Sequence, residues 1–116
     1  QEEGIKNEKN LMLKRKFRLP KGIRFNNSSL LSSPLFILKI KKNGLLFNRC
    51  AIIESKKVDK RAVVRNRIRR LISSCLEELY NELKQGKDMI FIVKKEAVDK
   101  SREIFFKEIK MTLEKA

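Results

Sequence analysis

The stretch SKKVDKRAVVRNRIRRL, residues Ser55–Leu71, decides how the rest of the chain is organised. It holds eight cationic residues and a single acid, Asp59. It also begins an amphipathic helix, because apolar residues recur at steps of three and four and therefore share one face. These residues are Val64, Ile68, Leu71, Ile72, Cys75, Leu76, Leu79 and Leu83. We expect the helix to run from residue 59 or 60 to Lys84, with Asp59 as its N-cap and Gln85-Gly86 as its stop.

The charge along this helix runs against ordinary helix electrostatics. A helix N-terminus carries partial positive charge, so cations there are mildly unfavourable. Here the arginines crowd the first turns, whereas Glu77, Glu78 and Glu82 lie in the C-terminal half. An external polyanion such as a phosphate backbone accounts for this order, and we favour it over a merely solvated basic face. The stretch therefore predicts a nucleic-acid contact surface.

The composition agrees with a polyanionic partner and excludes several enzyme classes. The 116 residues suit one domain, and 29 Lys and Arg against 14 Asp and Glu give a net charge of +15. The absence of histidine removes imidazole acid–base catalysis and any Ser–His or Cys–His pair. Cys50 and Cys75 lie among apolar residues and are interpreted as buried, reduced thiols. No apolar run reaches membrane-spanning length, so we expect a cytoplasmic protein without a membrane or small-molecule partner.

The remaining pattern predicts an α+β domain. We expect a flexible tail over residues 1–11 and one RNA-binding domain over 12–116. Strands are predicted at 34–41, 49–55 and 89–93, the last covered on both faces, with an Asn43-Gly44 turn and a small extra strand around Leu30. Residue 99 or Ser101 caps a last helix that carries Phe105, Ile109 and Leu113 on one face. Such an order places helices on one side of a small mixed sheet.

Three motifs resemble the signature of the bacterial ribonuclease P protein subunit. They are Ser55-Lys56-Lys57-Val58, then Ala62-Val63-Val64-Arg65-Asn66-Arg67, then Arg69-Arg70-Leu71. Their order, spacing and strand-then-helix context all agree with that family, and this combination is more specific than Arg-Asn-Arg alone. The resemblance implies a protein that binds a catalytic RNA and assists removal of the 5′ leader from precursor tRNA. It also implies an αβββαβα sandwich with a left-handed crossover and a short first helix. In this chain Gly22, Asn26-Asn27 and Ser28-Ser29 predict that this helix is shortened further.

The resemblance further implies which residues act. The family's catalytic RNA would be bound by Lys56, Lys57, Lys60, Arg61, Arg65, Asn66, Arg67, Arg69 and Arg70. The single-stranded leader would contact Phe17, Phe25 and Phe36, with Leu38 as a further candidate on the inward face of the sheet. Catalysis would belong to ribonuclease P RNA and to Mg²⁺ that the RNA holds, so the protein is expected to supply no catalytic residue and no metal ligand.

The sequence departs from the family at three places near these residues. Ala51 stands where a glycine is usual. Glu54 precedes the Ser-Lys-Lys motif, where it can pair with a neighbouring cation and lower the local affinity for RNA. Ser73-Ser74 stands where the family often has Arg-Glu, so one phosphate contact is expected to be missing.

Two other classes of protein remain open at this point. A structural ribosomal or nucleoid protein shares the charge and the helix but would not assist a reaction. A basic amphipathic membrane-surface element would need the apolar helix face that the predicted strands require for their core.

Overall fold

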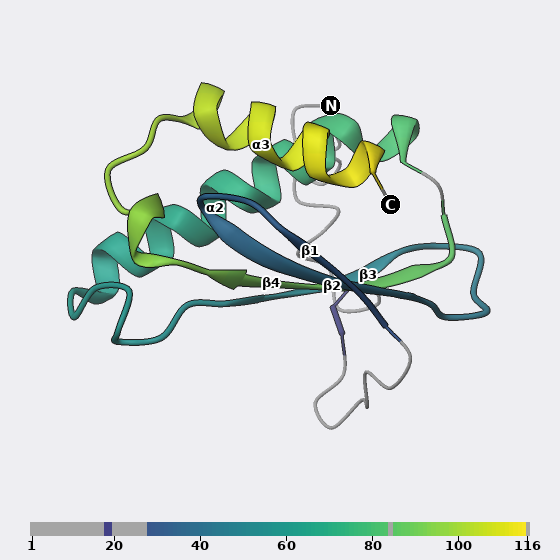
Figure 1. Cartoon of the computed structure of the whole chain (residues 1–116), viewed down its shortest axis with the longest axis horizontal. Helices are drawn as coiled ribbons and strands as arrows, with labels where there is room; N and C mark the ends of the chain where they lie inside the picture. The colour runs from purple at the N-terminus through teal and green to yellow at the C-terminus, as the bar shows by residue number, and fades with distance from the viewer. Residues whose placement is uncertain (1–17, 20–27, 84, 116) are drawn as a thin grey trace, which may run out of the picture.

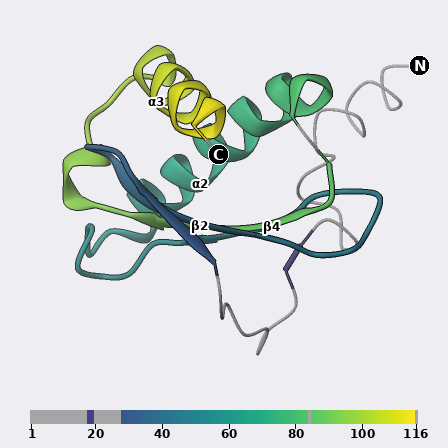
Figure 2. The same cartoon turned by 45° about the vertical axis from the view of Figure 1, so that its right-hand side comes forward.

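The computed structural model describes residues 18–19, 28–83 and 85–115. Within them the chain forms β1 (Ser29–Ser32), β2 (Phe36–Lys42), β3 (Arg49–Ile53), α2 (Ala62–Leu79), β4 (Lys87–Val93) and α3 (Arg102–Glu114). Short 3₁₀ turns follow α2 at Tyr80–Glu82 and β4 at Lys95–Ala97. Figures 1 and 2 show α2 and α3 on the same side of the sheet. The α+β class, the extra strand at Leu30 and the helices on one side are therefore confirmed.

The sheet has the order β1-β2-β4-β3, which sequence order alone does not suggest. β2 pairs antiparallel with both β1 and β4, whereas β3 pairs parallel with β4. The chain does turn at Gly44, whose φ of 73° suits glycine. However, the two strands that flank this turn are not neighbours, because β4 lies between them. The connection from β3 through α2 to β4 is thus a parallel crossover, and its left-handedness stays a prediction.

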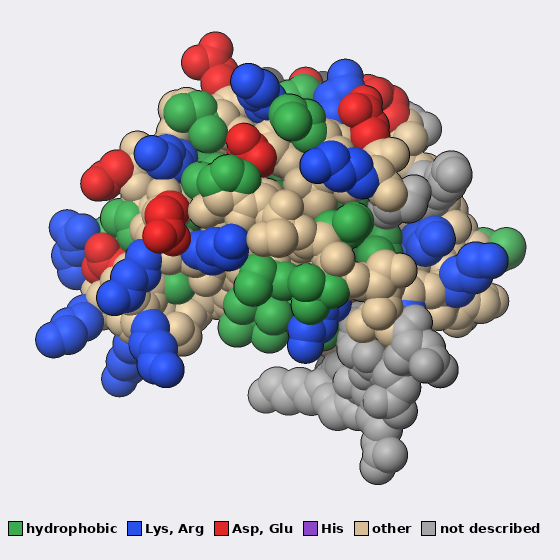
Figure 3. All heavy atoms as spheres, in the orientation of Figure 1, with side chains coloured by type: hydrophobic (Ala, Val, Ile, Leu, Met, Phe, Trp, Pro, Cys, Tyr) green, Lys and Arg blue, Asp and Glu red, His purple; other side chains and the backbone are tan. Residues whose placement is uncertain are grey.

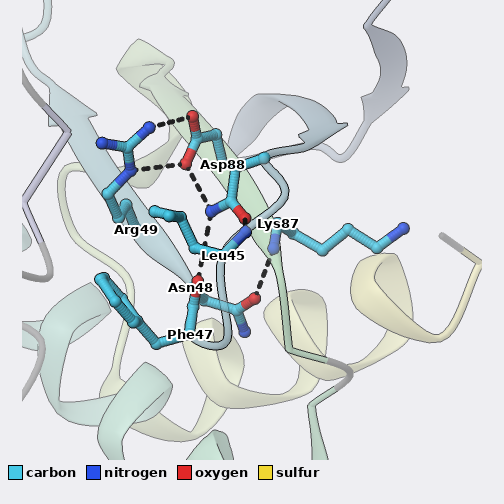
Figure 4. A network of polar contacts seen from close by, with 7 residues as sticks. Leu45, Phe47, Asn48, Arg49, Lys87 and Asp88 are labelled. Atoms are coloured by element: carbon cyan, nitrogen blue, oxygen red, sulfur yellow. Dashed lines mark hydrogen bonds and ion pairs between the residues drawn. The ribbon is translucent and has the colours of Figure 1, made fainter.

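A polar network fixes the long β2–β3 connection against the start of β4 (Figure 4). Asp88 is 1 % exposed and accepts hydrogen bonds from Arg49 at 2.9 and 2.8 Å and from Asn43 at 2.8 Å. Asn48, also 1 % exposed, accepts from the Lys87 N–H at 2.8 Å. Gly86 closes the contact: its φ is 87°, and a Cβ there would lie 2.9 Å from the Leu45 carbonyl oxygen. These bonds give partners to polar groups that would otherwise be buried without a hydrogen bond.

α2 is shorter than predicted at both ends. It begins at Ala62 with Arg61 at the N-cap position, and no side chain caps it. The prediction of Asp59 as N-cap is wrong because its carboxylate instead accepts the Arg61 N–H at 2.8 Å, in the turn before the helix. At the other end the backbone tightens into the 3₁₀ turn at Tyr80. The Gln85 side chain then donates to the Tyr80 and Leu83 carbonyls at 3.2 and 3.3 Å.

The core lies between the helices and one face of the sheet. The apolar stripe of α2 is buried at Ile68, Ile72, Cys75, Leu76 and Leu79, as its period predicts. From α3, Phe105 and Ile109 are fully buried. Ser101 is the N-cap of α3, because its hydroxyl accepts the Ile104 N–H at 3.4 Å. Of the two predicted N-caps, residue 99 and Ser101, the structure therefore selects Ser101.

The central strand β4 is less enclosed than predicted. Its helix-facing Met89, Phe91 and Val93 are buried, but Ile90 and Ile92 on the opposite face stay partly exposed. The expectation of a strand covered on both faces is therefore wrong, and the continuous apolar run reflects one buried and one half-buried face.

Both cysteines are buried and unpaired with each other, as predicted. Desolvation raises the pKa of the Cys50 thiol to about 12. Burial also raises the pKa of the Cys75 thiol, to about 11. Neither thiol is therefore reactive at neutral pH in the folded chain.

Candidate nucleic-acid interface

The nine residues predicted to bind RNA lie together, around the loop that leads into α2 and along the first turns of that helix. We call them the α2 basic surface: Lys56, Lys57, Lys60, Arg61, Arg65, Asn66, Arg67, Arg69 and Arg70. Eight of them are exposed and Arg65 is partly buried. Figure 3 shows Lys and Arg side chains gathered at the left of the molecule, where the loop and the start of α2 lie in Figure 1. The structure thus brings the predicted residues into one surface.

The loop that carries this surface is held by its own polar contacts. Val58 is 8 % exposed and anchors the loop in the core, and its N–H donates to the Ser55 carbonyl at 2.9 Å. The Arg61 guanidinium donates two hydrogen bonds to the Asp59 carboxylate, at 3.0 and 2.9 Å. Hydrogen bonds from Arg61 lower the pKa of Asp59 to about 2. Arg65 donates to the carbonyls of Asp59 and Lys60 at 2.8 and 2.9 Å. Arg61 and Arg65 therefore stabilise the conformation of the loop and also give it positive charge.

Arg69 is paired with Glu54, one of the positions where the sequence departs from the family. The Arg69 Nε and Nη2 groups both donate to one carboxylate oxygen of Glu54, the Nε bond measuring 3.0 Å. The Glu54 side chain is 5 % exposed, whereas that of Arg69 is 49 % exposed. The other carboxylate oxygen of Glu54 is buried without a hydrogen-bond partner. The prediction that Glu54 pairs with a neighbouring cation is confirmed, and its effect on RNA affinity stays a prediction.

Most of the remaining surface is not neutralised. Among the described residues, the side chains of Lys56, Lys57, Lys60, Asn66 and Arg70 make no hydrogen bond or ion pair. The first turn of α2 contains no acidic residue. A helix start that exposes unpaired cations beside its own unpaired N–H groups attracts an external anion. The geometry can thus bind phosphates.

The structure places the three phenylalanines predicted to contact the leader differently from that prediction. Phe36 is fully buried on the helix side of the sheet, where its ring meets Phe91 edge to face at 5.2 Å. The prediction of Phe36 as a leader contact is therefore wrong, and Leu38, also fully buried, is excluded for the same reason. The alternation of β2 turns both side chains into the core. Phe17 and Phe25 lie outside the described residues.

The opposite face of the sheet presents a mixed surface of apolar and basic side chains. The register aligns Leu30 with Lys39 and Ile90 across β1, β2 and β4. In the next row Ile37, Ile92 and Ile53 are partners. Leu30 is 62 % exposed and Ile53 is 47 % exposed. Apolar side chains interleaved with lysine at this exposure suit an unpaired nucleic-acid strand.

One cation beside the α2 basic surface escaped the sequence analysis. Arg102, at the start of α3, donates to the Ser74 hydroxyl at 3.1 and 3.0 Å and to Glu78 at 2.8 Å. It therefore brings positive charge to Ser74, the position where a contact was expected to be missing. The motif could not reveal it, because Arg102 is 28 residues further along the chain than Ser74.

The described part of the chain gathers no group of three or more residues that could ligate a metal ion. Nor does any helix in those ranges combine the length and apolarity needed to cross a bilayer.

Comparisons with known proteins decide the family. The family model described as Ribonuclease P matches residues 7–116. The chain belongs to the ribonuclease P protein family. It is 36 % identical over 83 residues to the ribonuclease P protein component of Alkaliphilus oremlandii, a match that covers 72 % of this chain and 68 % of that protein. It is 32 % identical over 91 residues to that of Caldanaerobacter subterraneus, covering 78 % of this chain and 74 % of the relative.

Solved structures of ribonuclease P proteins share the fold. The protein from Thermotoga maritima superposes with a TM-score of 0.77 at 19 % identity, over 85 % of this chain and 96 % of that one. A Staphylococcus aureus RNase P protein mutant gives 0.79 at 23 % identity, over 90 % and 91 %. As a ribonuclease P protein component, the chain is a subunit of a ribonucleoprotein endoribonuclease of tRNA 5′ processing, and its partner includes RNA.

Proposed function

We propose that the α2 basic surface binds the catalytic RNA of ribonuclease P. The observation that carries this proposal is the concentration of exposed cations in the loop before α2 and in its first turns, where helix electrostatics alone would favour acids. Arginine suits the role because its planar fork can bridge two phosphate oxygens and its charge does not titrate. Asn66, exposed among the arginines, would add amide hydrogen bonds.

The 5′ leader of precursor tRNA is the second proposed partner. The exposed Leu30 and Ile53 and the lysines of β2 support binding of this unpaired strand on the open face of the sheet. Phe17 and Phe25 remain the proposed aromatic contacts. The complex would act in the bacterial cytoplasm.

Catalysis itself is proposed to depend on Mg²⁺ held by the RNA, where clustered phosphate oxygens supply the ligands that divalent ions prefer. The protein would lower the repulsion between the catalytic RNA and its substrate, because its cations replace counterions between the two phosphate backbones. It would thereby reduce the Mg²⁺ concentration that cleavage needs.

The test is cleavage of a 5′-leader precursor tRNA by a bacterial ribonuclease P RNA at low Mg²⁺, with and without the protein. We expect the wild-type chain to restore cleavage at the mature 5′ end. The variant Arg67→Ala/Arg70→Ala should restore it poorly, whereas Lys107→Ala/Lys110→Ala, which removes the same charge from exposed positions of α3, should act like wild type. Binding without any gain in cleavage would instead support a general RNA-binding protein of the ribosomal type.

A further inference from the structure

A hollow of about 580 Å³ lies between the first half of α2 and the start of α3. Its lining combines three guanidinium groups with two apolar side chains: Arg67, Arg70, Arg102, Val63 and Leu71. Val63 is 75 % exposed, which is high for a valine beside a helix-packed core. The ribonuclease P motif accounts for the α2 arginines, but it does not account for this hollow or for Arg102.

Two of the arginines span the gap between the helices in opposite directions. From α2, the Arg67 Nη2 donates to the Lys100 carbonyl at 3.3 Å, just before α3 begins. From α3, the Arg102 Nε and Nη2 donate to Ser74 of α2, and Nη2 also reaches Glu78. In each case one edge of the guanidinium is anchored while other N–H groups remain available, since arginine has five. The hollow is therefore flanked by cations whose positions are already fixed.

The charge balance of the hollow favours an anion. Of its three arginines, only Arg102 is bonded to an acid, Glu78, among the described residues. Arg70 has no side-chain partner in the same ranges. Val63 is exposed and Leu71 is partly buried, so covering them with an apolar or aromatic surface lowers the free energy.

We propose that this hollow binds an unpaired nucleotide of the partner RNA, with Arg70 and Arg102 on its phosphate and Val63 and Leu71 against its base. The inference rests on the proposed RNA binding through α2 and adds a nucleotide site to which α3 contributes. An unpaired nucleotide fits because its base is free to leave the stack and lie on apolar or guanidinium surfaces. A duplex keeps its bases inside and offers the hollow only its backbone.

The test separates the base contact from the phosphate contact. Binding of an in vitro transcribed bacterial ribonuclease P RNA is measured over a series of salt concentrations. Val63→Ala should weaken binding roughly threefold without changing the salt slope, because it removes apolar contact and no charge. Arg102→Ala should weaken binding and lower the slope by about one. Arg102→Lys should keep the slope but lose roughly threefold in affinity, since lysine lacks the fork.

Controls guard against effects on folding. Val63 is exposed and Arg102→Lys retains the charge, so urea unfolding of both variants should match wild type. Lys107→Ala removes one exposed cation from α3 and should leave affinity almost unchanged. If Val63→Ala and Arg102→Lys both bind the RNA with wild-type affinity while Arg70→Ala binds it more weakly, the nucleotide site alone is overturned. Absence of binding by the wild-type chain would overturn both this inference and the proposed function.

A tethered cleavage reagent locates the nucleotide directly. Val63→Cys introduces an exposed thiol for iron–EDTA attachment, and the buried Cys50 and Cys75 should stay unmodified in the folded chain. Hydroxyl radicals from this position should cut the bound RNA at a nucleotide outside its duplexes. Cuts confined to base-paired segments would overturn the assignment of an unpaired nucleotide.

Discussion

Arg49 and Arg70 are chemically identical side chains in opposite settings. Arg49 donates two bonds to Asp88 in the network at the start of β4, and its side chain is 19 % exposed. Arg70 stands in the exposed start of α2 with no side-chain partner among the described residues. The first arginine is committed to the fold, and the second is available to a ligand.

The difference between these regions is the acid, not the arginine. Asp88 is buried and accepts three side-chain hydrogen bonds, so its loss would leave Arg49 and Asn43 without an acceptor inside the protein. Around α2 the acids are few and sit at the margins, as Glu54 does beside Arg69. We expect substitutions in the network to affect stability, and substitutions on the α2 basic surface to affect RNA binding.

The largest effect is expected for Asp88→Ala. It leaves Arg49 and Asn43 without their acceptor and should lower the free energy of unfolding by roughly 2–4 kcal/mol. Urea unfolding followed by circular dichroism measures this change. The double variant Arg49→Leu/Asp88→Leu should lose less than Asp88→Ala, because no buried charge is then left unpaired. The RNA affinity of the folded fraction should be unchanged, and a large loss of affinity would show that the network also supports RNA binding.

The same network predicts the response to acid. Burial tends to raise the pKa of Asp88, but bonds from Arg49 and Asn43 and nearby cations outweigh it and hold that pKa below its usual value. A depressed folded-state pKa stabilises the fold above the unfolded-state pKa of about 4, and this stability is lost as pH falls further. Unfolding free energies measured from pH 6 to pH 2 should decline below about pH 4. Asp88→Asn should remove part of that decline. The rest of the decline should persist, because protonation of Asp59, whose pKa is about 2, also destabilises the folded chain.

On the α2 basic surface, Arg70→Ala is the cleanest test. Because Arg70 has no partner in the described structure, its loss should leave the unfolding free energy within about 0.5 kcal/mol of wild type. Affinity for ribonuclease P RNA should fall roughly tenfold, and the salt slope should drop by about one. A variant that unfolds like wild type and retains the full slope would remove Arg70 from the interface.

The smallest effect is expected for Glu54→Gln, which follows the end of β3 and pairs with Arg69 of α2. Releasing Arg69 from its carboxylate should tighten RNA binding roughly twofold to threefold, because one negative charge that repels phosphates is removed. Glu114→Gln, an exposed position at the far end of α3, controls for net charge. Weaker binding by Glu54→Gln would show instead that Glu54 positions Arg69 for the RNA.

The sequence predicted well wherever a local pattern has one physical outcome. The stripe on α2 and the Phe105 and Ile109 face of α3 were correctly placed because helical period alone determines which residues share a face. The α2 basic surface clusters for a simpler reason, because its nine residues all lie within residues 56–70 of the chain. Phe36 was misplaced because the two faces of β2 are distinguished only by what packs on them, and the period of two does not say which face is inward.

Contacts between distant segments required the tertiary structure. Glu54 was expected to pair with some cation, but only the approach of β3 to α2 selected Arg69. Arg102 lies outside the motif, and only the packing of α3 on α2 brings it to Ser74.

The helical stripe, the excess of positive charge and its concentration at one helix start could all be predicted from local sequence. These depend on neighbours within a few turns, where covalent geometry fixes distances. The strand order β1-β2-β4-β3, the network around Asp88 and the hollow between α2 and α3 arise only when the chain folds. These join residues tens of positions apart, and their pairing depends on how the apolar faces pack together rather than on any local spacing.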